Sequence, residues 1–139
     1  FIVATRGRVL LEGNTFNRCA SPGVLCGGDA ESWFESGPVL DMTIRNNKFI
    51  DCGVGIDPRS SSDDPNEFVH QNIRIPGNFF DGAGVSARNA KGLTITGNRF
   101  TDKTLPFEQK ACSDLIVKDN ELNVPKQTAV TSPSSAPPP

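Results

Sequence analysis

Residues 42–49 read Met-Thr-Ile-Arg-Asn-Asn-Lys-Phe, which is an alternation of apolar and polar residues followed by a turn residue, an Asn and a Phe. The same order (apolar, any, apolar, any, turn residue, Asn, any, Phe or Leu) occurs five times. The copies are residues 9–16, 42–49, 73–80, 93–100 and 115–122. Because five copies are hard to obtain by chance in 139 residues, the pattern predicts a chain built from one repeated structural unit.

The repeated unit has a simple physical interpretation. Alternation with a period of two is typical of a strand that buries one face, and the residue before the Asn tolerates the positive φ of a sharp bend. Successive copies of the Asn lie 33, 31, 20 and 22 residues apart. The minimal period of 20 to 22 residues is too short for ankyrin or TPR repeats, and the unit lacks the leucine-rich consensus. We predict an all-β fold, a right-handed parallel β-helix of about five coils, incomplete at the N-terminus.

A second strand is predicted in each coil, at residues 23–26, 53–56 and 84–87. When these segments are aligned on their Gly-Val pairs, Gly27, Asp57 and Arg88 become equivalent. The repeated Asn and Phe should form structural ladders along the solenoid, since stacked coils lie about 4.8 Å apart.

The four cysteines include one pair at equivalent positions. Cys19 and Cys52 each lie five residues after a repeated Asn, so we expect them in adjacent coils. There they form either a disulfide or stacked thiols.

Composition excludes several classes of protein. A net charge of −2 argues against a nucleic-acid-binding surface. No stretch approaches the roughly 18 apolar residues of a membrane span. The cysteines contain no CxxC pair and there is one histidine, so we expect no metal site and no cofactor. The repeats predict a β-helix over residues 1–124, followed by a Pro/Ser-rich tail or linker over residues 125–139.

Two coils carry insertions, residues 27–38 and 57–70, which leave from the end of the second strand. Insertions in repeat proteins tend to lie on one face and to carry function. The first insertion groups carboxylates with aromatic residues, a composition typical of a sugar site. The carboxylates are Asp29, Glu31 and Glu35, and the aromatic residues are Trp33 and Phe34. The alternative is a solvated acidic loop that its aromatic residues anchor.

The second insertion adds candidates of the same chemistry. Asp57 lies near the first insertion in the predicted register, and carboxylates on adjacent or next-adjacent coils can reach the roughly 6.5–9.5 Å separation of an inverting glycosidase. An Asp57–Arg88 ion pair is the alternative interpretation of these two residues. His70 either orients a carboxylate or caps the returning loop. Asp63 and Asp64 have no regular spacing for Ca²⁺, so a solvated loop is favoured there.

Four segments resemble the β-helix of glycoside hydrolase family 110. These are residues 7–16, 29–39, 44–52 and 69–75, within a similarity that spans roughly residues 5–122. The resemblance implies an inverting exo-α-1,3-galactosidase, active on terminal galactose of the blood-group-B-like kind. It carries a catalytic acid over to Asp29, where the family often has adjacent aspartates and this chain reads Gly28-Asp29. It also implies a further acid on a preceding coil.

Together these observations predict a carbohydrate-active β-helix, part of an α-1,3-galactosidase-like glycoside hydrolase. The expected catalytic residues are Asp29, Glu35 and Asp57. The expected substrate-binding residues are Glu31, Trp33, Phe34, Arg88 and His70. The expected partner is a glycan with terminal galactose, with no nucleic acid and no membrane, and this substrate class implies a secreted or periplasmic protein. The alternatives are a non-catalytic carbohydrate-binding or structural module, of the adhesin or spike kind, and a polysaccharide lyase.

Overall fold

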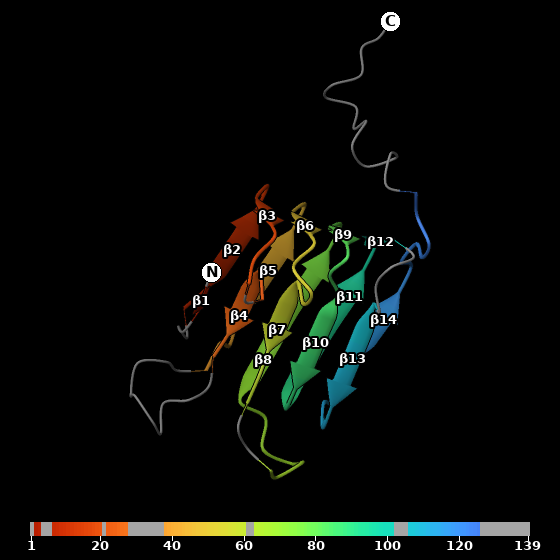
Figure 1. Cartoon of the computed structure of the whole chain (residues 1–139). Helices are drawn as coiled ribbons and strands as arrows, with labels where there is room; N and C mark the ends of the chain where they lie inside the picture. The colour runs from red at the N-terminus through yellow and green to blue at the C-terminus, as the bar shows by residue number, and fades with distance from the viewer. Residues whose placement is uncertain are drawn as a thin grey trace, which may run out of the picture.

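The computed structural model describes residues 2–3, 7–20, 22–27, 38–60, 63–101 and 106–125. These residues form three parallel sheets that the chain visits in turn, coil after coil (Figure 1). The predicted all-β parallel β-helix is therefore confirmed. None of the described residues forms a helix long and apolar enough to cross a membrane.

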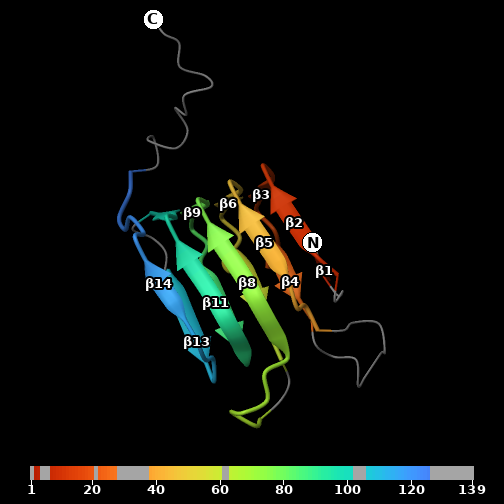
Figure 2. The ribbon, with the colours of Figure 1, turned by 180° about the vertical axis from the view of Figure 1, so that it is seen from behind.

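Each coil adds one strand to each sheet, except that the coil of β13 and β14 has no strand in the third sheet, and the strands pair in parallel. The first sheet contains β1 (Ile2–Val3), β4 (Val24–Cys26), β7 (Ile56–Pro58), β10 (Val85–Arg88) and β13 (Phe107–Lys110). The second contains β2 (Val9–Glu12), β5 (Met42–Arg45), β8 (His70–Pro76), β11 (Ala90–Thr96) and β14 (Ile116–Lys118). The third contains β3 (Thr15–Asn17), β6 (Lys48–Ile50), β9 (Phe79–Asp81) and β12 (Arg99–Phe100). Figure 2 shows the second sheet from behind, with its strands side by side.

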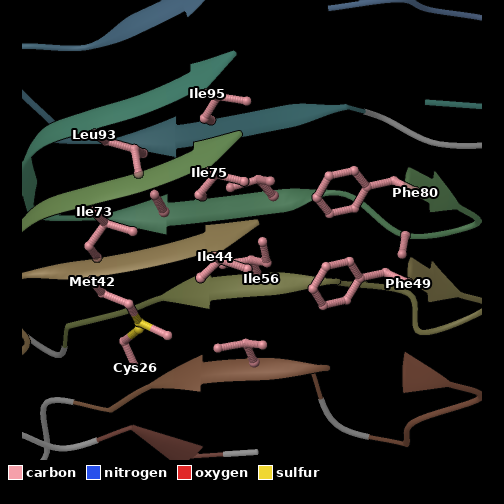
Figure 3. Packing of buried hydrophobic residues seen from close by; sticks show 14 of the residues in the cluster. Cys26, Met42, Ile44, Phe49, Ile56, Ile73, Ile75, Phe80, Leu93 and Ile95 are labelled. Carbon is pink, nitrogen blue, oxygen red and sulfur yellow. The ribbon is translucent and has the colours of Figure 1, made fainter. Parts of the chain in front are cut away.

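The repeated Phe residues form a continuous stack in the interior. Neighbouring rings lie 4.9, 4.9 and 4.7 Å apart between centroids and within 8° of parallel, in the order Phe16, Phe49, Phe80, Phe100. Figure 3 shows Phe49 and Phe80 at one side of the core, with the isoleucines of the second sheet beside them. The Phe ladder predicted from the repeat is therefore confirmed.

The repeated Asn residues form the second ladder, at the turns between the second and third sheets. The backbone N–H of each Asn donates to Oδ1 of the Asn in the next coil, over 2.7–2.9 Å. Each Nδ2 from Asn47 onward also donates to a backbone carbonyl of the preceding coil, such as Asn78 Nδ2 to Ile44 O at 2.8 Å. The buried amides are thus satisfied, and these bonds hold the coils in register.

The register of the first sheet differs from the predicted one. Val24 pairs with Ile56, and Ile56 with Val85, so Gly55 rather than Gly53 is equivalent to Gly23. A Cβ on Gly55 would lie 3.0 Å from the Phe80 ring and 3.1 Å from a backbone oxygen. Gly53 instead lies in the turn with a φ of 73°. The predicted alignment was therefore wrong by two residues, because the glycine that the Phe stack requires is the second one in the sequence Gly-Val-Gly.

All four cysteines are free thiols. Cys19 and Cys52 lie in adjacent coils, as the repeat predicts, since Asn17 pairs with Ile50 two residues earlier. Desolvation by burial raises the pKa of the Cys52 thiol, which also interacts with Cys19. Of the two alternatives, this structure contains the stacked thiols.

The Phe stack makes a quantitative prediction. Phe49→Ala should lower the free energy of unfolding by about 3–5 kcal/mol, because it opens a cavity between Phe16 and Phe80. Phe68→Ala is the matched control, since Phe68 is only partly buried in a loop under Lys91. It should cost far less. Urea denaturation of both variants measures the difference, and equal losses would contradict the assignment of Phe49 to the core stack.

Candidate functional site

The candidate site lies at the corner where strands of the first sheet end and strands of the second sheet begin. Only Asn89 separates β10 from β11, whereas much longer connections follow β4 and β7. Since β4 pairs directly with β7, both long connections leave the same corner on adjacent coils. The fold therefore brings the two predicted insertions to one place.

Five of the predicted site residues lie outside the described residues, because they fall within residues 28–37. These are Asp29, Glu31, Trp33, Phe34 and Glu35. Their catalytic and substrate-binding roles stay predictions. The described part of the corner contains the other three, Asp57, His70 and Arg88.

Asp57 is the central residue of β7 and lies on the outer face of the first sheet, with 12% of its side chain exposed. Arg59 donates to Asp57 Oδ2 from both Nε, at 3.0 Å, and Nη2, at 2.5 Å. The two residues are two apart on an extended chain, so their side chains share a face. Arg59 was missed as a site residue, although this spacing was visible in the sequence.

The corrected register changes the neighbours of Asp57. Gly27 and Arg88 are not its equivalents, so the predicted strip of these three residues was wrong. Asp57 pairs with Leu25, and the pairing of Val85 with Ile56 puts Ser86 on its other side. A second row, of cationic side chains, runs parallel to the row of Asp57 and lies two residues further along the chain. This row contains Arg59, Arg88 and Lys110, of which Arg88 and Lys110 pair directly.

Arg88 is partly buried on this basic row. Its Nη2 donates to Asp63 Oδ1 over 3.3 Å, and Asp63 is almost fully exposed. A surface ion pair of this kind contributes little to stability. The substrate-binding role predicted for Arg88 stays a prediction, but the residue lies on the outer face next to the loop that follows β7.

Asn89 anchors the loop that follows β7, and the sequence did not predict this role. It has a φ of 54° and is 1% exposed. Its Nδ2 donates to two loop carbonyls, Asp64 O at 2.8 Å and Glu67 O at 2.9 Å, and its own carbonyl accepts from Val69 N at 3.0 Å. The only signal for this role in the sequence was the absence of an insertion after β10. Asn89 is therefore the single residue that connects β10 to β11.

His70, the first residue of β8, is fully buried and links the two long connections. Its Nδ1 accepts from Val39 N at 3.1 Å, so Nε2 carries the proton and donates to Arg59 O at 2.9 Å. Val39 follows the first insertion, and Arg59 is the first residue after β7, in the second insertion. This geometry fits the loop-capping alternative. The imidazole ring has no exposed surface. A substrate-binding role for His70 stays a prediction.

Burial determines the protonation of the groups beneath the corner. Desolvation by burial lowers the pKa of His70, while hydrogen bonds to the backbone of Arg59 and Cys26 and the charge of Asp57 oppose this shift. Desolvation raises the pKa of Cys26 to about 12, and Asp57 adds to this increase. The Cys26 thiol is therefore protonated at neutral pH and is not an activated nucleophile. Within the described residues, no three His, Cys, Asp or Glu side chains come together as metal ligands would.

The fold and this corner define the class of protein, and comparison with known families agrees. The chain belongs to the right-handed β-helix family, which matches residues 1–136. It is 33% identical to α-1,3-galactosidase A of Bacteroides thetaiotaomicron over 88% of this chain and 24% of that protein. It is 37% identical to α-1,3-galactosidase A of a Bacteroides fragilis strain, over 94% of this chain and 25% of that protein.

A third relative is α-1,3-galactosidase A of Akkermansia muciniphila, which is 38% identical over 78% of this chain and 19% of that protein. These similarities confirm the resemblance to α-1,3-galactosidases. The chain spans about a quarter or less of the length of the relatives it matches.

The buried His70 makes stability depend on pH. Since its pKa in the folded state lies below the ordinary 6.5, the unfolded chain binds the proton more readily. Stability is therefore complete above about pH 6.5 and falls as the pH drops from that value toward the folded-state pKa. Urea denaturation between about pH 8 and pH 5 should show this loss.

His70→Gln provides the control, because His70 is the only histidine in the chain. The variant should be less stable at neutral pH, having lost the Val39 and Arg59 bonds in their native geometry. It should also lack the decrease in stability that begins near pH 6.5. An unchanged slope in the variant would show that another group titrates in this range.

Proposed function

We propose that this chain forms part of an inverting exo-α-galactosidase that hydrolyses terminal α-1,3-linked galactose. The observation that supports the proposal most strongly is the similarity to proteins named α-1,3-galactosidase over 78–94% of the chain. The corner described above adds a structural argument, since it brings two insertions together on adjacent coils. A glycan substrate implies a secreted or periplasmic location.

Inversion requires two carboxyl groups roughly 6.5–9.5 Å apart, so that a water molecule fits beside the sugar. Coils stacked about 4.8 Å apart allow this separation between residues of adjacent or next-adjacent coils. Asp29 follows β4 by three residues, and Asp57 lies on the neighbouring strand β7. We assign the catalytic pair to Asp29 and Asp57, with Glu35 as the alternative to either.

In this mechanism one carboxylic acid protonates the glycosidic oxygen as the bond from that oxygen to the anomeric carbon breaks. The other carboxylate removes a proton from the water that attacks the opposite face of the sugar. Trp33 and Phe34 would stack on the apolar face of galactose, while Glu31 and Arg88 would bind its hydroxyls. Arg59 holds the Asp57 carboxylate in place, and His70 fixes the backbone carbonyl of Arg59.

A non-catalytic carbohydrate-binding or structural module is the second candidate. The observation that favours it is the pairing of charges on the outer face, where Asp57 bonds to Arg59 and Arg88 to Asp63. A face of paired charges suits hydrogen bonding to the hydroxyls of a glycan without hydrolysis. Turnover distinguishes the two candidates.

The test uses the whole protein that carries this chain and a substrate with a terminal α-1,3-linked galactose. Asp29→Asn should reduce turnover about 10²–10⁴-fold, because it removes an ionisable proton while keeping the shape. The melting temperature should hardly change. Glu31→Gln and Glu35→Gln should lose less. Glu67→Gln is the matched control, since it changes an exposed carboxylate of the second insertion and should retain activity.

Asp57→Asn tests the second member of the pair and should also reduce turnover strongly. If Glu35→Gln abolishes turnover while Asp29→Asn retains it, the acid role belongs to Glu35. NMR of the first product identifies the stereochemistry, and β-galactose is expected for inversion. Glycan binding without any hydrolysis would support the binding module instead.

A further inference from the structure

We propose that Cys19 and Cys52 form a disulfide site, at which a disulfide-bearing oxidant joins the two thiols and links two adjacent coils covalently. Cys19 lies between β3 and β4, and Cys52 lies between β6 and β7 (Figure 1). Both therefore lie at the corner between the third and first sheets, away from the candidate catalytic corner. The site does not depend on the proposed function.

The two cysteines occupy the same position in adjacent coils. β3 and β6 pair along their whole length, and a backbone bond from Arg18 N to Ile50 O, at 2.8 Å, continues this ladder. Arg18 and Asp51 then have nearly the same left-handed φ, 56° and 51°. Because the two backbones follow the same path, the Cα atoms of Cys19 and Cys52 are expected at the spacing of stacked strands, about 4.8 Å. Disulfides span roughly 4.4–6.8 Å between Cα atoms.

The Cys52 side chain points toward the coil that contains Cys19. Its Sγ lies 3.4 Å from Phe16 O, a backbone atom of that coil. The Cys52 and Cys19 side chains are also close enough to form a hydrogen bond with each other. On the opposite side, the pairing of β6 with β9 puts Ala83 at the equivalent position of the next coil. Within this column of described residues, Cys52 therefore has one thiol neighbour, which is Cys19.

The other two cysteines lie elsewhere in the fold. Cys26 is a core residue of β4 (Figure 3) and pairs with Pro58, six residues further along the chain than Cys52. Cys112 lies between β13 and β14, in the last coil that the structure describes. Of the pairings that four cysteines allow, the described fold therefore supports only that of Cys19 with Cys52.

The disulfide would strengthen a corner where the backbone ladder between these two coils is interrupted. The second and third coils are joined here by a bond from Gly53 N to Gly82 O at 3.1 Å. The corresponding bond between the first and second coils would run from Ala20 N to Cys52 O, and these two described residues do not form it. Cys52 O instead accepts from Val54 N at 2.7 Å. A covalent link at this position would replace the missing connection.

The interruption also gives Cys19 the freedom that the bond requires. Cys19 lies four residues before Gly23, whereas Cys52 lies three residues before Gly55, and the pairing of β4 with β7 makes these glycines equivalent. The first coil therefore has one extra residue here, as in a β-bulge, and its backbone departs from regular stacking. A small shift of Cys19 then brings the two Cβ atoms from the stacking distance to the roughly 3.5–4.5 Å of a disulfide.

The reaction consists of two thiol–disulfide exchanges with an oxidant such as glutathione disulfide. The Cys19 thiolate attacks the oxidant, which forms a mixed disulfide and releases one half of the oxidant as a thiolate. The Cys52 thiolate then attacks the Cys19 sulfur of this mixed disulfide and releases the other half. The two cysteines lose two protons and two electrons, and the oxidant gains them as two thiols. Burial raises the pKa of the Cys52 thiol, so Cys52 is the second to react.

The bond would close a loop of chain that carries the first insertion. Cys19 and Cys52 lie 33 residues apart, on either side of residues 27–38. Closing a loop of this size restricts the unfolded chain and so favours the folded state. Such a bond persists in oxidising compartments and is reduced in the cytosol.

The first test uses the whole protein that carries this chain, reduced, folded and then treated with glutathione disulfide. The remaining thiols are alkylated, and the protein is digested without reductant and analysed by mass spectrometry. A cross-linked pair of peptides that contain Cys19 and Cys52 is expected, with Cys26 and Cys112 recovered as alkylated thiols. Cys112→Ala is the matched control and should form the same cross-link.

Thermal unfolding gives an independent measurement. The oxidised protein should unfold about 5 °C or more above the same protein treated with dithiothreitol. Cys52→Ala should abolish this difference. The variant should fold, because the next coil has alanine at the same position. Cys112→Ala should retain the difference.

Three results would overturn the proposal. The first is recovery of Cys19 and Cys52 as alkylated thiols after the folded protein has been treated with glutathione disulfide. The second is a cross-link from either residue to Cys26 or Cys112. The third is a Cys19–Cys52 cross-link that forms only after the protein is unfolded in urea, because the folded arrangement would then not bring the two thiols together.

Discussion

The bond from a backbone N–H to the Asn Oδ1 of the next coil is the constraint on which the rest of this structure depends. It satisfies polar groups that the fold buries, at a turn where the chain changes direction in every coil. Buried Asn47, Asn78 and Asn98 would otherwise incur the cost of unpaired amides. Because each Asn bonds to its equivalent, slipping one coil against the next by a single residue would break the whole ladder.

The Phe stack adds a steric constraint to this polar one. Its rings lie so close to the first sheet that Cβ atoms at Gly23 and Gly55 would approach the Phe49 and Phe80 rings to 2.9 and 3.0 Å. The glycines therefore determine how the first sheet pairs, and this pairing determines which residues surround Asp57. The neighbours of a candidate catalytic residue thus depend on aromatic packing on the opposite side of the sheet.

The corner combines rigid support with variable connections. His70 and Asn89 use buried side chains to hold backbone groups at the beginning or end of the long connections. A functional site on loops requires such support, because the buried side chains keep the charged residues of the outer face in position. The paired charges of Asp57 with Arg59 and of Arg88 with Asp63 then define the polarity of the face beside the insertions.

The sequence by itself determined the repeat, the parallel β-helix and the ladders, because a period-two pattern followed by a repeated turn encodes one coil at a time. The five Asn-containing units needed no knowledge of distant contacts. Only the tertiary structure decided the neighbours of Asp57 and the role of His70. The choice between Gly53 and Gly55 depends on where the Phe80 ring lies, and a local pattern does not contain that information. His70 likewise bonds to Val39 and Arg59, 31 and 11 residues away, and such partners are set by how coils stack rather than by the residues beside it.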